Sequence, residues 1–133
     1  MPKVEVLYKK SSEGFGRGGQ FCLSFLQESL PFIIATGLNV PGNRAATLSP
    51  DEIEVSFRER STFDVSTNDF DITVFANYFP ERAKNLQTRT QDIERRLATG
   101  LSKARIAPAY VVLFSVYVRL ANAGFVEGHT DRP

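Results

Sequence analysis

The chain has little of the chemistry on which metal sites, disulfides and histidine-based catalysis depend. Its 133 residues include one cysteine, Cys22, one histidine, His129, and no tryptophan. A single cysteine excludes an internal disulfide framework and is typical of a reducing compartment. One histidine without a cysteine cluster gives no usual zinc ligand set and argues against a histidine-based triad. We therefore expect no metal site.

The chain also lacks an excess of either charge and any long apolar segment. It has 16 basic and 15 acidic residues, for a net charge of +1, so its surface has no general attraction for nucleic acid. The apolar run that ends at Phe114 is interrupted by Ser115 and is far too short to span a bilayer. No charged-then-apolar leader precedes the first predicted strand. We expect a soluble cytoplasmic domain without nucleic-acid or membrane partners.

The first part of the chain indicates a strand, a loop and a helix. Residues 2–9 alternate between apolar and polar side chains, which predicts a strand at the very start. The glycine-rich stretch Ser11–Gly19 predicts a loop. From Gln20 the spacing becomes helical, with a kink or break expected at Pro31 and a left-handed helix end at Gly37. The apolar side of this helix holds Phe21, Phe25, Leu26, Leu30, Ile33 and Ile34.

The second part repeats this plan. Alternation predicts a second strand over residues 53–58 and a third over residues 72–78. A helix is expected to open at Pro80, with an apolar stripe that buries one face. Residues 110–118 are apolar on both faces, as expected for a strand inside a sheet. Residues 122–133 are expected to be a tail or an interface arm of one domain spanning residues 1–133.

These elements predict an α+β fold of two tandem β-α-β units, in β-α-β-β-α-β order. Right-handed crossovers would place both helices on one face of a four-stranded sheet. The other face would carry Thr73, Phe75 and Phe79, which look too apolar to stay in water. We therefore expect a homo-oligomer.

One glycine pattern points weakly to a phosphate-binding loop. Gly14, Gly16 and Gly19 match G-x-G-x-x-G between a predicted strand and a predicted helix. The dinucleotide-binding fingerprint also requires a second strand and an acidic residue about 20 positions later. The region Thr36–Pro41 has neither, so a flexible loop is the better interpretation.

Pro2 is the residue that most directly suggests catalysis. If Met1 is removed, Pro2 becomes a secondary amine at the end of a strand. A free α-amino group has a pKa near 8, and burial lowers that pKa because it disfavours the cation. A neutral amine can then take a proton from a carbon beside a carbonyl group. If Met1 is retained, the Pro2 nitrogen is an amide without useful basicity, and the alternative is a tolerated starting residue.

The chain resembles the tautomerase superfamily. It has the β-α-β-β-α-β plan, it opens Met1-Pro2-Lys3-Val4, and its stretch PFIIATGL over residues 31–38 resembles P-x-x-x-A-T-G-[IL]. That motif ends the first helix of 5-carboxymethyl-2-hydroxymuconate isomerase, a double-length member of the superfamily. A second link is the third strand running through residues 79–82 (FPER) into the second helix. The resemblance extends to about Val118.

The resemblance implies a cofactor-independent isomerase that forms a homotrimer. Pro2 would be the general base, and arginines would hold a small 2-oxo or 2-hydroxy-unsaturated carboxylic acid. Arg82 matches an arginine that several relatives use in this way, and Arg44 is near a carboxylate-binding arginine of the isomerase branch. A planar guanidinium suits this role because it gives two parallel hydrogen bonds to a carboxylate. For both, a solvated surface position is the alternative. Because amine and guanidinium groups supply proton transfer and charge, no metal or organic cofactor would be needed.

Three further residues complete the predicted site. Arg58, on the polar side of the second strand, is a third candidate for substrate binding, with pairing to Glu54 as the alternative. Phe75 and Phe79 are candidates to line an apolar pocket, with core or interface packing as the alternative. The competing function is a non-catalytic protein of the same fold, or a ferredoxin-like binding or oligomerisation module.

Overall fold

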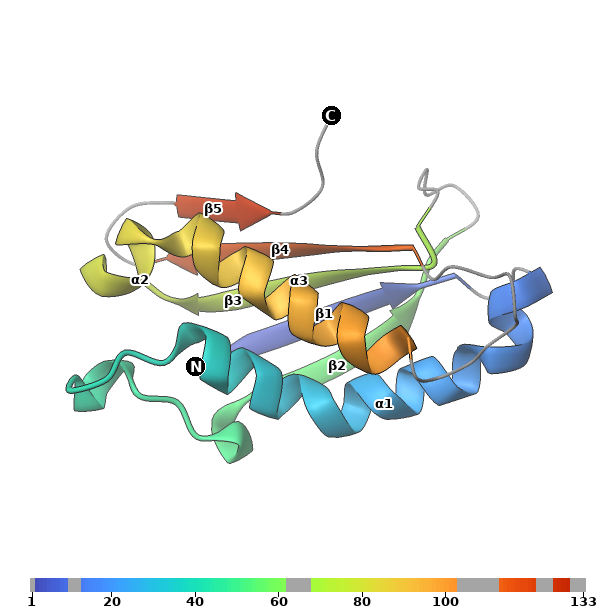
Figure 1. Cartoon of the computed structure of the whole chain (residues 1–133), viewed down its shortest axis with the longest axis horizontal. Coiled ribbons are helices and arrows are strands. Elements are labelled where there is room, and N and C mark those ends of the chain that lie inside the picture. Colours follow the sequence, from blue (N-terminus) through green and yellow to red (C-terminus); the bar gives the residue numbers. More distant parts are fainter. Residues whose placement is uncertain (1, 10–12, 62–67, 103–112, 122–125, 130–133) are drawn as a thin grey trace.

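The computed structural model describes residues 2–9, 13–61, 68–102, 113–121 and 126–129. The described strands form one mixed sheet in the order β2-β1-β3-β4-β5 (Figure 1). In it, β1 runs parallel to β2 and antiparallel to β3, β3 runs parallel to β4, and β4 runs antiparallel to β5. The strands are β1 (Lys3–Tyr8), β2 (Glu54–Glu59), β3 (Phe70–Asn77), β4 (Phe114–Ala121) and β5 (Val126–His129).

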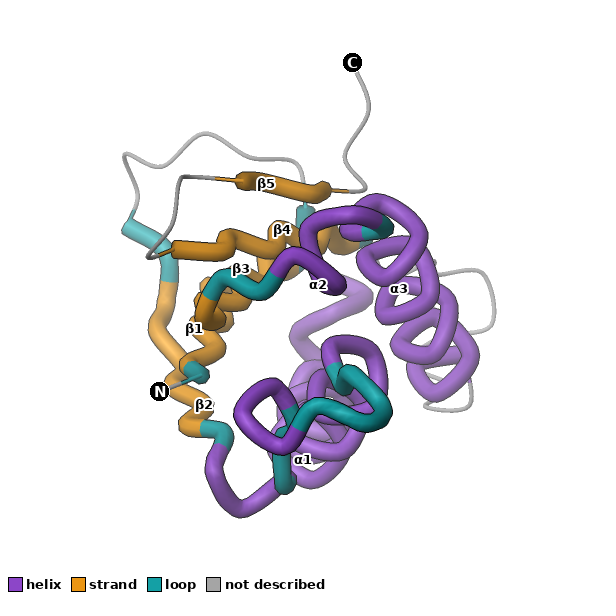
Figure 2. Tube along the Cα trace, turned by 90° about the vertical axis from the view of Figure 1, so that its left-hand side faces the viewer, coloured by secondary structure: helices purple, strands orange, loops and turns teal. Residues whose placement is uncertain are grey.

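Both long helices cover the same face of this sheet (Figure 2). Helix α1 (Glu13–Leu38) joins β1 to β2, and the short helix α2 (Pro80–Lys84) and helix α3 (Leu86–Ser102) follow β3. Two short 3-10 helices, η1 (Arg44–Ala46) and η2 (Pro50–Glu52), lie between α1 and β2. The predicted α+β fold of tandem β-α-β units with helices on one face is therefore confirmed.

The structure corrects two sequence predictions: the number of strands in the sheet and the ferredoxin-like alternative. The sheet has a fifth described strand, because residues 126–129 of the predicted tail pair with the outer edge of β4. The ferredoxin-like alternative also fails, because in a split β-α-β unit another strand lies between the two parallel strands. Here β1 pairs directly with β2, and β3 pairs directly with β4.

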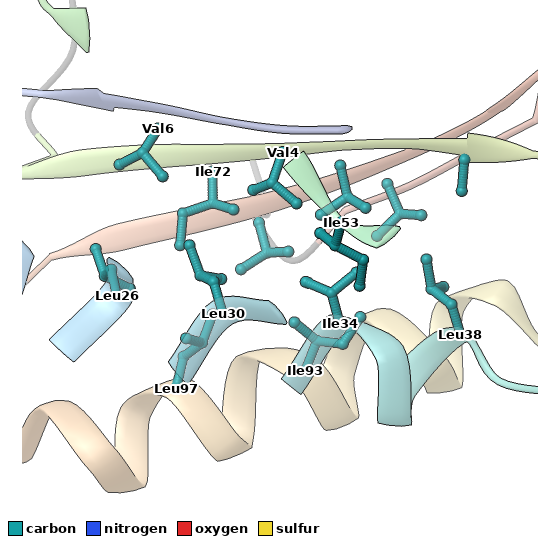
Figure 3. Packing of buried hydrophobic residues seen from close by; sticks show 14 of the residues in the cluster. Val4, Val6, Leu26, Leu30, Ile34, Leu38, Ile53, Ile72, Ile93 and Leu97 are labelled. Atoms are coloured by element: carbon teal, nitrogen blue, oxygen red, sulfur yellow. The ribbon is translucent and has the colours of Figure 1, made fainter. Parts of the chain in front are cut away.

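The core lies between the sheet and the two long helices (Figure 3). Alternate residues of β1, β3 and β4 point toward the helices, as the period of two requires. Every fourth residue of α1 from Cys22 to Leu38 packs against these strand residues, and α3 contributes a second apolar stripe to the core. Fully buried side chains in this core include Val4, Val6, Leu26, Leu30, Ile34, Leu38, Ile72, Ile93, Leu97, Val116 and Val118.

The first helix differs from its prediction at both ends and in the middle. It begins at Glu13, so most of the stretch predicted as the loop Ser11–Gly19 is helical, and it continues without a break through Pro31. Residues 11 and 12 lie outside the described part. Once a helix has formed, each added residue contributes another hydrogen bond. Extension therefore continues through glycines that disfavour helix by about 1 kcal/mol each.

Gly37 also has a different role from the one predicted. It lies inside α1, and the positive φ among the described glycines is found at Gly42 instead, at +83°.

The predicted second helix is divided into α2 and α3 at Asn85, whose φ of −127° and ψ of 34° are not helical. The fourth strand is β4 at Phe114–Ala121, later than the predicted residues 110–118, of which 110–112 are outside the described part.

Within the described residues, no helix combines the length and the apolar character that a membrane span requires.

Candidate functional site

Pro2 lies buried just before β1, an inner strand of the sheet between β2 and β3. Its carbonyl oxygen accepts a hydrogen bond from the Glu54 main-chain nitrogen at 3.3 Å, which ties it to the start of β2. On the other side, Lys3 pairs with Phe75, so the antiparallel register continued by one residue brings Ala76 of β3 beside Pro2. Pro2 therefore sits between the start of β2 and the end of β3. Met1, which decides whether the Pro2 nitrogen is an amine or an amide, is outside the described residues.

The end of the molecule that holds Pro2 also holds several connecting segments. Figure 1 shows the start of β1, the last turn of α1, η1 and α2 at this same end. Pro80 begins α2, as expected for a residue whose missing N–H costs nothing in the first turn of a helix. Arg44, in η1, and Arg82, in α2, therefore belong to segments at the Pro2 end of the sheet.

Arg82 is enclosed by main-chain carbonyl groups. The residue is 1% exposed. Its Nε donates to the Leu38 oxygen at 2.8 Å, its Nη1 to the Asn77 oxygen at 3.0 Å and its Nη2 to the Ala46 oxygen at 2.6 Å. Burial lowers the pKa of Arg82, and the nearby charge of Arg89 lowers it further. An arginine nevertheless remains charged at neutral pH.

A second arginine, which the sequence analysis did not single out, holds the same helix end. Nη1 of Arg89 donates to the Gly37 and Asn39 oxygens, both at 2.9 Å, and its Nε donates to Oδ1 of Asn85 at 2.7 Å. The last turn of α1 contains no basic residue of its own. Cations stabilise the partial negative charge at a helix C-terminus. The lack of a local cation is compatible with a cation supplied from another helix, but nothing in the sequence points to Arg89 in particular.

Arg44 lies at the surface of the loop between α1 and β2. This loop is fixed at both sides of Arg44, by the bond from Arg82 to Ala46 and by a 3.2 Å bond from Nδ2 of Asn43 to Oε2 of Glu81. The pKa of Glu81 is lowered, first by a hydrogen bond from its own main chain and then by that from Asn43. The structure thus offers an exposed guanidinium on a fixed loop at the Pro2 end.

Within one chain, Arg58 lies far from Pro2. It is exposed on the helix-free face and pairs in register with Leu7, five residues along β1 from Pro2. At about 3.3 Å per residue, this corresponds to roughly 16 Å along the strand.

The two predicted pocket residues lie on different elements. Phe75 lies half-buried on the helix-free face of β3, where the Arg119 guanidinium carbon is 5.9 Å from its ring centroid. Phe79 follows the strand and caps α2, with the Arg82 guanidinium carbon 4.9 Å from its ring centroid. Each ring therefore supports a guanidinium group, at distances where a cation–π attraction operates.

The structure gives no support to a nucleotide site at the glycine motif. Gly14, Gly16 and Gly19 lie within α1, whereas a phosphate-binding loop precedes its helix and presents free main-chain N–H groups. In the described part of the chain, no three His, Cys, Asp or Glu residues are placed to hold a metal ion.

No protein-family model matches the chain, and no curated protein matches it. Among solved structures, the chain is similar to the crystal structure of Leishmania major MIF2, with a TM-score of 0.46 and 14% sequence identity. The alignment covers 95% of this chain and 97% of that one. At this level of similarity, no activity and no residue role is transferred from that protein.

Proposed function

We propose that this protein is a tautomerase-like isomerase that uses Pro2 as its general base. The observation that supports this most directly is the placement of Pro2, which is buried at the start of β1 and flanked by β2 and β3. The tandem β-α-β architecture agrees with the plan that the sequence resemblance implied. The finer assignment, to the branch of 5-carboxymethyl-2-hydroxymuconate isomerase, rests on the PFIIATGL stretch and is part of the proposal.

The chemistry follows from the position of the amine. With Met1 removed, Pro2 carries a secondary amine in a buried position, where the neutral form is favoured. This amine takes a proton from the carbon beside the carbonyl of a 2-oxo acid, or from the hydroxyl of its enol, and returns it at the other position. Positive groups stabilise the negative charge that develops on the enolate oxygen. No metal or organic cofactor enters this reaction.

Among the three predicted substrate arginines, Arg44 fits this reaction best in one chain. Its guanidinium is exposed, on a loop at the Pro2 end of the sheet. Arg82 uses its guanidinium to hold three carbonyl groups, and Arg58 lies at the other end of β1. We therefore propose Arg44 as the group that binds the substrate carboxylate.

The proposal includes a homotrimer in the cytoplasm. Among the described elements, no helix covers the second face of the sheet (Figure 2). Phe75 lies on that face, because it alternates with the buried core residues of β3. A neighbouring copy would cover this face and could bring Arg58 to a site from which it is distant in its own chain.

The test begins with the intact mass of the purified protein. A mass short by one methionine is expected, because the mechanism needs a free amine at Pro2. Turnover of enol–keto substrates is then compared in three variants: Pro2→Ala, an inserted lysine between Met1 and Pro2, and Pro41→Ala as an exposed-proline control. The insertion converts the amine to an amide and should abolish turnover, whereas the control should be unaffected. Undiminished activity in the insertion variant would refute the proposed mechanism.

The competing proposal is a non-catalytic protein of the same fold. It is favoured by the contacts of Arg82, since a guanidinium bound to three carbonyls is not presented to a ligand. A retained Met1, together with no turnover of any enol–keto substrate, would establish this alternative.

A further inference from the structure

Arg82 joins three segments of the chain, two of which are distant from it in sequence. Its donors reach the last residue of α1, the last residue of η1 and the last residue of β3: Leu38, Ala46 and Asn77. These bonds span up to 44 positions in the sequence. With the residue 1% exposed, the contacts are made inside the protein and not at its surface.

One of these segments adjoins the proposed base, and another carries the proposed carboxylate-binding group. Asn77 follows Ala76, the residue that the register places beside Pro2. Ala46 ends η1, which begins at Arg44, and the same loop continues into β2, whose Glu54 bonds to Pro2. A shift of Ala46 relative to Asn77 would therefore shift Arg44 relative to Pro2.

The three bonds depend on the shape of the guanidinium group. Its nitrogens lie in one plane and point in different fixed directions, whereas the ammonium of lysine is a single point of charge. A lysine at this position would keep the charge but could not hold three separated carbonyl groups with the same geometry. The Arg82→Lys substitution therefore tests the shape of the guanidinium group while it keeps the positive charge.

We propose that Arg82 is a positioning residue, which holds the loop carrying Arg44 in a fixed place relative to Pro2. This proposal rests on the proposed function, and it replaces the direct contact with substrate that the sequence predicted for Arg82. Arg82 acts through the main chain of η1 and β3, and Arg44 makes the contact with the substrate carboxylate.

Hydrogen–deuterium exchange tests the structural part without any need for activity. In Arg82→Lys, the amides of residues 43–47 and 76–79 should exchange about tenfold faster, because a local opening becomes easier. Arg89→Lys is the matched control, since Arg89 holds the same helix end through Gly37 and Asn39. The control should affect the end of α1 and leave residues 43–47 unchanged. Equal exchange at residues 43–47 in wild type and Arg82→Lys would overturn the proposal.

Arg82→Gln is a second variant for the case that Arg82→Lys does not fold. Its neutral amide leaves no buried charge and cannot replace all three bonds to Leu38, Ala46 and Asn77, so residues 43–47 should again exchange faster than in wild type. Unchanged exchange of residues 43–47 in a folded Arg82→Gln protein would overturn the proposal.

A double-mutant cycle tests the functional part. Arg44→Gln in wild type should lower kcat/KM by about tenfold or more, and Arg82→Lys by a similar factor, since small misplacements are costly in catalysis. In the Arg82→Lys background, Arg44→Gln should have a much smaller effect, because the two act through one contact. Additive effects would mean that Arg82 acts independently of Arg44 and would overturn the proposal. An inactive wild type would refute the proposed function alone, and the exchange experiment would still decide whether Arg82 holds the loop.

Discussion

Gly37 in α1 lies directly against Ile93 in α3. A Cβ atom at Gly37 would be 2.5 Å from Cγ1 and 2.9 Å from Cδ1 of Ile93, distances that real Cβ atoms do not adopt. Ile93 is fully buried among the other core residues. The two helices can therefore approach this closely because one of them has no side chain at this point.

Gly37→Ala should lower the free energy of unfolding by about 1–3 kcal/mol, because a methyl group is forced into a filled core. Urea unfolding measures this change. The control is the same substitution in an Ile93→Ala background, where the clashing atoms are gone. There it should be neutral or stabilising by up to about 1 kcal/mol, since alanine favours helix over glycine. A loss of equal size in both backgrounds would show that the contact with Ile93 is not the cause.

Arg89→Gln should destabilise the protein by about 1–3 kcal/mol, because it removes a charged donor from two carbonyls at the end of α1. Arg96→Gln, on the same helix, is the comparison. Arg96 is half-exposed and pairs with Asp92 across one helical turn, so its loss should cost less than about 1 kcal/mol. If urea unfolding gives equal losses for both variants, the capping role of Arg89 is wrong.

Cys22 should be unreactive in the folded protein. Burial, and to a lesser extent the charge of Asp69, raises the pKa of its thiol from 9.0 to about 11. A thiol-specific reagent at pH 8 should therefore label Cys22 only after addition of urea, because the reactive species is the thiolate. Rapid labelling without urea would contradict the burial of this residue.

The same pKa shift predicts a pH dependence of stability. Between about pH 9 and 11 the Cys22 thiol of the unfolded chain loses its proton while that of the folded chain keeps it. The unfolded state then binds fewer protons, so the free energy of unfolding falls as the pH rises through this window. Urea unfolding from pH 8 to pH 11 measures the decline, which should be shallower in Cys22→Ala. An identical slope in the two proteins would rule out the thiol as its source.

Light scattering should give a native mass about three times the chain mass of 14.8 kDa. Phe75→Asp places a charge on the helix-free face of the sheet and should shift the protein toward monomer with its circular dichroism retained. Thr88→Asp, at an exposed position of α3, is the control and should leave the mass unchanged. A monomeric wild-type protein at micromolar concentration would exclude the proposed trimer.

Much of the fold could be predicted because its strands alternate in sequence. The apolar positions of β1 and β3 recur at every second residue, and Ile93 and Leu97 of α3 recur at helical spacing. These periods follow from local geometry, so they are visible without any knowledge of the partners. Pro2 was predicted as the first residue of the first strand on the same basis. In the structure β1 begins one residue later, at Lys3, and Pro2 is buried between β2 and β3.

The candidate site was less predictable, because its arginines look alike in sequence. Arg44, Arg58 and Arg82 each stand at a place where a substrate contact was plausible. The structure separates them by burial and position: Arg44 is exposed at the Pro2 end, Arg58 is distant along β1, and Arg82 is enclosed by carbonyl groups. Which carbonyls approach a side chain depends on how segments far apart in sequence meet.

The sequence by itself determined the order of the elements, the face that each buries and the place of Pro2 at the start of the first strand, because these depend on local periodicity and on chain order. Only the tertiary structure decided that Gly37 serves close packing, that residues 126–129 extend the sheet and that Arg82 binds Leu38, Ala46 and Asn77. The Gly37–Ile93 packing and the bonds from Arg82 to Leu38 and Ala46 join residues far apart along the chain. They form only when the whole core is assembled, so no local pattern records them.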